Sequence, residues 1–80
     1  MKNKNKVLIK IGSNIKKIRK KERLSQEELA FKTGLHRTYI GSVERGEKNI
    51  TILNLIKIAN SLEVDPTFFL NLNEKDDKIE

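Results

Sequence analysis

The sequence predicts a single all-helical domain. Apolar residues recur at helical spacing along most of the 80-residue chain, and no segment shows the apolar–polar alternation of a half-buried strand. A chain of this length is too short for two hydrophobic cores, and such a domain buries only about 60% of its unfolded surface. Oligomerisation is a common way for a domain this small to bury more surface.

The composition excludes several classes of protein. The chain has no cysteine, which excludes disulfides and thiolate metal sites. Its longest apolar runs, at residues 7–9 and 68–70, fall far short of the ~20 residues that a membrane helix needs. The lysine-rich start lacks the long apolar core of a signal peptide. We therefore expect a cytoplasmic protein with no membrane partner.

The charge is divided unevenly along the chain. Residues 1–50 contain 14 Lys and Arg against 5 Asp and Glu, a net charge of +9, whereas residues 51–80 contain 3 against 6, a net charge of −3. The basic part should face a polyanion. DNA, RNA and anionic membranes all attract basic proteins by the same electrostatics, so the charge alone does not choose among them.

The first predicted helix follows a basic arm. Residues 1–6 alternate lysine and asparagine, and we interpret them as a disordered arm that is either solvated or touches DNA. The helix should begin between residues 7 and 13, because Gly12 and Ser13 weaken its first turn, and should end near residue 22 or 23. Its apolar stripe consists of Leu8, Ile11, Ile15 and Ile18.

The next two helices are short and joined by a glycine. Residues 25–28 read Ser-Gln-Glu-Glu, a capping box in which Ser25 and Glu28 exchange hydrogen bonds. Gly34 should end this helix in the left-handed conformation. A third helix should run from residue 36 or 37 to Arg45, with Ile40 inside. Two short helices around a glycine turn are typical of a helix-turn-helix, here over about residues 26–45.

Two further helices are predicted before the chain turns acidic. Thr51 can cap the fourth helix, and Asp65 with Pro66 can open the fifth. The inner face of the fourth is expected to contain Ile52, Leu55, Ile56, Ala59 and Leu62, and the apolar surface of the fifth Phe68, Phe69, Leu70 and Leu72. We thus place the domain at residues 7–72 and a frayed acidic tail at residues 73–80.

Several segments together resemble a known family. The stretches 25–30, 34–35, 39–40, 43–46 and 58–59 are similar to the Cro/repressor-type helix-turn-helix, and residues 34–49 resemble the controller proteins of bacterial restriction-modification systems. The resemblance covers about residues 15–70. It implies a five-helix, Cro/repressor-like domain whose second and third helices form the helix-turn-helix, and a homodimer on a pseudo-palindromic operator in double-stranded DNA. It also implies autoregulation: a first bound dimer activates with RNA polymerase, and a second represses. Such a protein works in the bacterial cytoplasm, on the nucleoid when bound.

The start of the third helix holds the candidates for base contact. Arg37 lies where side chains of such a helix meet base edges, and its guanidinium can donate two hydrogen bonds to guanine. The alternatives are a phosphate contact or a solvated arginine. Thr38 can bond a base edge or touch a thymine methyl, and Ser42, one turn on, can donate to a base or a phosphate. His36 is either a weak helix cap, a DNA contact or an exposed spectator.

Other polar residues are candidates for the DNA backbone. By the resemblance, Gln26 bonds a phosphate and braces the third helix; otherwise it is an exposed first-turn residue. By the same resemblance, Tyr39 reaches the DNA backbone or supports a bent operator; otherwise it is half-buried with its hydroxyl on water. The loop that follows the third helix should position phosphates through Arg45, Lys48, Asn49 and Thr51.

Two sets of residues are assigned structural roles. The resemblance pairs Arg19 with Glu44 in an ion pair that orients the third helix. Apolar residues that a small core cannot hold should form the dimer interface, since an outward apolar set indicates a subunit surface. This predicted interface consists of Leu53, Phe68, Phe69 and Leu72; the alternative is a monomer core with one exposed leucine.

The sequence therefore predicts a dimeric DNA-binding regulator without cofactor or metal. A single histidine makes no credible metal site, and no nucleophile–base pair or phosphate-binding glycine loop is visible, so we do not expect an enzyme. Three alternatives remain: a phage-type or orphan repressor, an antitoxin-like protein that also binds a protein partner, and an RNA binder, which the scarcity of stacking aromatics disfavours.

Overall fold

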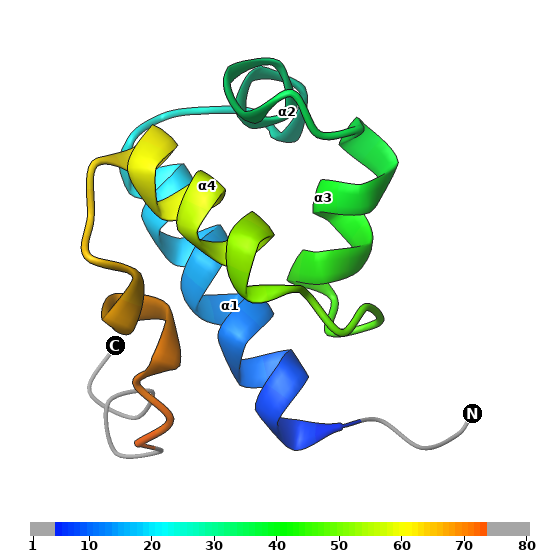
Figure 1. Ribbon diagram of the computed structural model, residues 1–80, viewed down its shortest axis with the longest axis vertical. Helices are drawn as coiled ribbons and strands as arrows, with labels where there is room; N and C mark the ends of the chain where they lie inside the picture. The colour runs from blue at the N-terminus through cyan, green and yellow to red at the C-terminus, as the bar shows by residue number, and fades with distance from the viewer. Residues whose placement is uncertain (1–4, 74–80) are drawn as a thin grey trace.

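A computed structural model describes residues 5–73 of the chain (Figure 1). In this range the chain forms α1 (Lys6–Lys21), α2 (Gln26–Thr33), α3 (Arg37–Glu44), α4 (Ile52–Leu62) and a short 3₁₀ helix, η1 (Pro66–Leu70). The domain measures 30 × 29 × 20 Å along its principal axes. The described residues contain helices and no strand, as the apolar spacing predicts, and none of these helices is long and apolar enough to cross a membrane.

The first helix begins one residue before the predicted range. The side-chain oxygen of Asn5 accepts hydrogen bonds from the amides of Val7 at 2.9 Å and Leu8 at 3.1 Å, which caps the helix ahead of the weak Gly12–Ser13 turn. Residues 5 and 6 of the predicted arm therefore belong to the structured domain. Residues 1–4 of the arm and 74–80 of the acidic tail lie outside the described part of the chain.

One apolar core joins all five elements. The α1 helix passes behind α4 and packs against both α3 and η1, while α2 packs against α3 and α4 (Figure 1). The largest fully buried side chains, which come from all five elements, are Ile15, Leu29, Ile40, Ile58 and Phe69. The core thus holds α3 against α1, and α2 against α3 and α4.

Helix α1 crosses α3 at a close approach that two glycines permit. A Cβ atom on Gly12 would lie 2.2 Å from the carbonyl oxygen of Val43 and 2.7 Å from that of Glu44. A Cβ atom on Gly46, which has a φ of +77°, would lie 2.7 Å from the Cα of Ile9. Both contacts are with backbone, which cannot move aside as a flexible side chain can. Gly12, which the sequence suggests only as a weak point in a helix, is therefore needed for packing.

The prediction of a fifth α-helix is wrong. Asp65 and Pro66 open a helix as predicted, but it is a five-residue 3₁₀ helix that ends at Leu70, so residues 5–73 contain four α-helices. The amide of Asn14 on α1 donates to the carbonyl oxygens of Phe69 and Asn71, each at 3.0 Å. In an α-helix the Phe69 carbonyl would accept from the amide of residue 73. That amide instead donates to the side chain of Asn71 at 3.2 Å, and Asn14 fixes the chain to α1 at this point.

The inner face of α4 is narrower than predicted. Leu55, Ala59 and Leu62 are buried as expected, but Ile56 is 38% exposed and Ile52 is 66% exposed. Ile52 stands in the first turn, where no other described helix covers it, and Ile56 lies at the edge of the buried stripe. These two isoleucines are therefore part of the surface.

Candidate nucleic-acid interface

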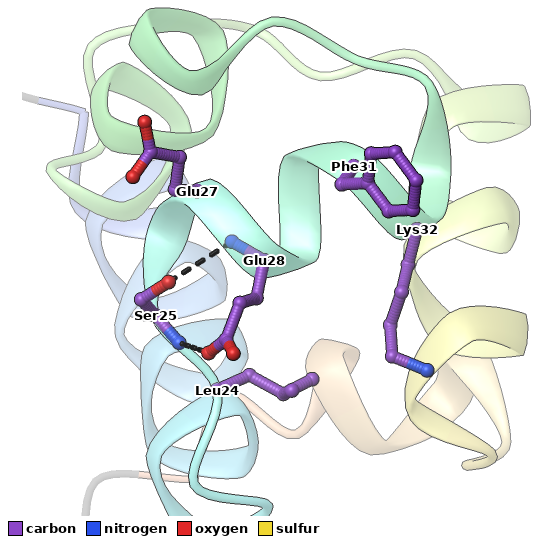
Figure 2. A pocket seen from close by; sticks show the side chains of 6 residues that line it. All are labelled: Leu24, Ser25, Glu27, Glu28, Phe31 and Lys32. Atoms are coloured by element: carbon purple, nitrogen blue, oxygen red, sulfur yellow. Dashed lines mark hydrogen bonds between the residues drawn. The ribbon is translucent and has the colours of Figure 1, made fainter.

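Helix α2 begins with the predicted capping box (Figure 2). The amide of Glu28 donates to the Ser25 hydroxyl at 3.0 Å, and the amide of Ser25 donates back to the Glu28 carboxylate at 2.8 Å. Two backbone amides that α2 leaves without helical acceptors are thereby satisfied. The cap fixes where α2 starts, and with it the position of Gln26.

The turn between α2 and α3 is also locally determined. Gly34 has a φ of +75°, and its amide donates to the carbonyl of Ala30 at 2.8 Å, as in a left-handed helix cap. The buried hydroxyl of Thr33 donates to the Leu29 carbonyl at 2.9 Å and accepts from the amide of Leu35 at 3.2 Å. The structure confirms the short helix, glycine turn and short helix expected from the sequence.

The N-terminal end of α3 points three polar side chains outward. His36, Arg37 and Thr38 are all exposed. His36 is the helix cap: its Nδ1 accepts from the amide of Thr38 at 3.2 Å, and the Thr38 hydroxyl lies 2.7 Å from the same nitrogen. The spectator role considered for His36 is therefore wrong, because its side chain holds the first turn of α3.

Ser42 does not share that surface. The residue is buried, and its hydroxyl donates to the carbonyl of Tyr39 at 2.9 Å. A serine inside a helix often satisfies its hydroxyl on the preceding turn in this way. The expectation that Ser42 faces DNA is corrected accordingly.

Tyr39 is half-buried, and its hydroxyl has a protein partner. The side-chain amide of Asn54 on α4 donates to the Tyr39 oxygen at 3.1 Å. The hydroxyl hydrogen of Tyr39 is not used in that bond, because the oxygen acts as the acceptor. The phenol is therefore held by α4 while it can still donate a hydrogen bond. Asn54 was not among the sequence candidates, and only its place near the start of α4 could have suggested it.

Arg19 and Glu44 form the ion pair that the family resemblance implied. The Arg19 Nε and Nη2 donate to the two carboxylate oxygens at 2.6 and 3.0 Å, and the two side chains are only 8% and 2% exposed. The Arg19 Nη1 donates to the carbonyl of Leu24 at 2.7 Å. Gln26 donates from Nε2 to Glu44 at 3.0 Å. One buried network thus connects α1, the α1–α2 loop, α2 and α3.

The loop after α3 carries the other predicted backbone contacts. Lys48 and Asn49 are exposed. Arg45 is exposed as well, and its Nε donates to the Glu47 carboxylate at 3.0 Å; this hydrogen bond, aided by the negative charge, raises the pKa of the Arg45 guanidinium. The hydroxyl of Thr51 accepts from the amide of Asn54 at 3.1 Å, which confirms Thr51 as the cap of α4.

The predicted dimer interface divides into exposed and buried residues. Leu53 is 76% exposed, and Phe68 and Leu72 are also exposed. Phe69, in contrast, is fully buried in the monomer core, so it has no surface to offer a partner and its assignment to the interface is wrong. The two neighbouring phenylalanines differ because η1 turns only one of them toward α1 and α4.

An open hollow lies beside α2 (Figure 2). It is lined by Leu24, Ser25, Glu27, Glu28, Phe31 and Lys32, and none of the predicted DNA-contacting residues is among them. Phosphate binding needs donors and positive charge, whereas this hollow holds two glutamates. In the described residues 5–73, no three His, Asp or Glu side chains are grouped as metal ligands.

Comparison with known proteins gives the family. The helix-turn-helix family matches residues 15–69. The control protein C.BamHI of Bacillus amyloliquefaciens is 41% identical over 68 residues, which make up 84% of each chain. The chain belongs to the helix-turn-helix family of control proteins. Members of this family are transcription regulators, so this control protein is a DNA-binding transcription regulator and not an enzyme.

Two solved structures agree with this assignment. The restriction-modification controller protein C.AhdI from Aeromonas hydrophila has a TM-score of 0.76 at 42% identity, over 78% of this chain and 94% of that one. SinR, a master regulator for biofilm formation solved in complex with DNA, has a TM-score of 0.73 at 37% identity, over 76% of this chain and 98% of that one. The fold of this control protein is therefore shared with both.

Proposed function

We propose that this control protein binds an operator as a homodimer and regulates the genes of a restriction-modification system, its own gene included. The observation that carries the proposal is the exposed start of α3, where His36, Arg37 and Thr38 face outward on a helix that a buried ion-pair network braces from behind. The similarity to the restriction-modification controllers supports the choice of target genes.

In this proposal Arg37 reads a base edge and the surrounding residues position the DNA backbone. An exposed guanidinium early in such a helix can donate two bonds to guanine O6 and N7. Gln26, Tyr39 and Lys48 would contact phosphates, which would fix the register without reading sequence. Activation by the first bound dimer would include a contact with RNA polymerase. Since the relatives are bacterial, the site of action would be the nucleoid in the cytoplasm.

Binding to DNA can be tested by fluorescence anisotropy. The duplex upstream of the protein's own gene is compared with a shuffled duplex at low and near-physiological salt. We expect the native duplex to bind hundreds of times more tightly at the higher salt, in line with the usual gap between specific and non-specific binding of about 10³ or more. Equal binding that weakens equally with salt would reduce the interaction to phosphate electrostatics and refute the proposal.

A pair of variants locates the reading side chain. Arg37→Ala should cost about 1–3 kcal/mol of binding to the native duplex and little on the shuffled one. The matched control is Lys32→Ala, which removes one exposed positive charge from α2 beside the hollow. This control should leave the ratio between the two duplexes unchanged. If both variants lose the same affinity on both duplexes, Arg37 does not read a base.

The homodimer is proposed to form through exposed apolar side chains of α4, η1 and the residues after η1. This set gathers the large apolar residues that the core leaves outside on those elements, and an outward apolar set of this kind indicates a subunit surface. Its members are Ile52, Leu53, Ile56, Phe68, Leu70 and Leu72.

Sedimentation equilibrium tests the dimer. Leu53→Glu puts a charge in the proposed interface and should shift the protein to monomer, without loss of folding because this side chain is already 76% exposed. Phe31→Ser is the matched control, since Phe31 is 90% exposed on α2, outside the proposed interface. If the Leu53 variant remains as dimeric as the wild type, the interface lies elsewhere.

A further inference from the structure

The contact between His36 and Thr38 determines where their hydrogens are. A backbone amide can only donate, and the Thr38 amide points at Nδ1 of His36 at 3.2 Å. This cap geometry matches an unprotonated Nδ1, which leaves the hydrogen of a neutral imidazole on Nε2.

The state of His36 then fixes the role of the threonine hydroxyl. The Thr38 Oγ1 lies 2.7 Å from the same Nδ1. With the hydrogen on Nε2, the hydroxyl is the donor in this contact and shares the lone pair of Nδ1 with the Thr38 amide. What Thr38 can offer to a molecule outside is then only the lone pairs of its oxygen. A free threonine hydroxyl, in contrast, can rotate and serve as donor or acceptor.

We propose that His36 makes Thr38 a hydrogen-bond acceptor at the DNA interface, so that Thr38 selects a base that carries an amino group in the major groove. The inference rests on the proposed function, since it assumes that the start of α3 enters that groove. There, adenine N6 and cytosine N4 are donors, whereas guanine O6 and thymine O4 are acceptors. An acceptor-only Thr38 favours adenine over guanine, or cytosine over thymine.

The same geometry gives His36 a role of its own. With its hydrogen on Nε2, the exposed ring presents a donor on the side away from Thr38. The start of α3 therefore presents donors at His36 and Arg37 and an acceptor at Thr38. His36 is a positioning residue for Thr38, and its effect on base choice is separable from its effect on helix stability.

The tautomer can be measured on the free protein. The chain has a single histidine, so the ¹⁵N spectrum of the imidazole is unambiguous. At pH 8.5, well above the ordinary imidazole pKa of about 6.5, we expect Nδ1 to resonate as an unprotonated nitrogen and Nε2 as a protonated one. A hydrogen on Nδ1 would overturn the inference whether or not the protein binds DNA.

The base preference is tested with selected duplexes. The wild type and Thr38→Val are each used to select binders from a randomised duplex pool, which identifies the base pair whose preference depends on the hydroxyl. At that pair we expect the wild type to favour adenine over guanine, or cytosine over thymine, by about tenfold, and Thr38→Val to lose the preference. A hydroxyl-dependent preference for guanine or thymine would overturn the inference.

Two substitutions of His36 separate polarity from capping. His36→Asn keeps a side-chain oxygen that can accept from the Thr38 amide and hydroxyl, so the base preference should be retained. His36→Ala removes the acceptor and frees the hydroxyl, so the preference should fall to within about threefold of equality while other positions of the operator stay selective. If the alanine variant keeps the full preference, His36 does not set the role of Thr38.

The outcomes distinguish this inference from the proposed function. If the wild type selects a specific duplex but no base pair responds to Thr38→Val, the protein binds an operator and the inference about Thr38 is wrong. If the wild type selects no duplex at all, the proposed function fails and the base preference falls with it, whatever tautomer the spectrum shows.

Discussion

The substitution Glu44→Gln tests the buried network in depth. Glu44 accepts three hydrogen bonds, from Arg19 Nε at 2.6 Å, Arg19 Nη2 at 3.0 Å and Gln26 Nε2 at 3.0 Å. Glutamine has one oxygen and one amide group, so one donor of Arg19 would face another donor, and the guanidinium would keep its charge at a site where its side chain is only 8% exposed.

The expected loss of stability is a large part of the total. Removing one partner of a buried ion pair typically costs about 3–5 kcal/mol. A domain of 80 residues is stable by roughly 4–12 kcal/mol, at the usual range of roughly 0.05–0.15 kcal/mol per residue. Because about 1 kcal/mol shifts Tm by 4–8 °C at this size, we expect Glu44→Gln to lower Tm by at least about 12 °C. Urea and thermal unfolding followed by circular dichroism measure both quantities.

An exposed ion pair provides the matched control. Arg45 and Glu47 are also joined at 3.0 Å, but their side chains are 61% and 51% exposed. Water screens such a pair, so Glu47→Gln should change the unfolding curve very little. If Glu44→Gln lowers the free energy of unfolding by less than about 1 kcal/mol, the buried network does not have the energetic role argued from its geometry.

A double variant separates stability from orientation. Arg19→Met combined with Glu44→Leu replaces the pair by apolar residues, which is often neutral for stability. It also removes the acceptor that holds Gln26. We therefore expect stability to recover while DNA affinity stays reduced. Recovery of both would refute the idea that the network orients α3 for binding.

Two other positions give independent predictions. Gly12→Ala should lower the free energy of unfolding in urea by about 1–3 kcal/mol, because the new Cβ would lie 2.2 Å from the Val43 carbonyl oxygen. This overpacking cost exceeds the gain of up to about 1 kcal/mol in helix propensity. Equal or higher stability would contradict the close approach of α1 and α3. Hydrogen bonds from the Thr67 amide, and to a lesser extent from the Thr67 hydroxyl, lower the pKa of Asp65. The contribution of Asp65 to stability is therefore complete above its unfolded pKa of about 3.9, and it is lost as the pH falls through the lower folded pKa. Asp65→Asn keeps an acceptor but does not titrate, so the Tm of this variant should fall less steeply than that of the wild type between pH 5 and pH 3. Calorimetry over this range measures both curves, and parallel curves would contradict the assignment.

The features that could be predicted from sequence are those set by local chemistry. The capping box at Ser25, the left-handed Gly34 and the caps at Thr51 and Asp65 depend on residues within a few positions of each other, and all four are present. The Arg19–Glu44 pair is 25 residues apart and could be expected only through the family resemblance.

The features that could not be predicted depend on contacts with side chains from a distant element of the chain. Asn14 holds the end of η1 from a position 55 residues away in the sequence, and periodicity alone gives no sign of this. Asn54 holds Tyr39 from another helix in the same way. The sequence predicts core and surface equally well for Phe68 and Phe69, because it does not show which of the two η1 turns toward the core. The sequence candidates on α3 itself, His36 to Thr38, were placed correctly on the surface because capping fixes the start of that helix.

Helix α1 contacts both α3, which is proposed to enter the DNA groove, and the chain around η1, which is part of the proposed dimer interface. Through Gly12 it touches the carbonyls at the end of α3, and two residues later Asn14 holds the chain around η1. The same helix therefore joins the helix proposed to enter the groove to the apolar residues proposed to pair two copies. In such a dimer the distance and angle between the two α3 helices would depend on α1. One extra base pair at the centre of an operator turns its halves by roughly 34° and separates them by roughly 3.4 Å. A dimer that keeps its α3 helices at a fixed spacing can follow that change only by deforming the DNA, so it would discriminate operators by the length of a spacer that it never reads.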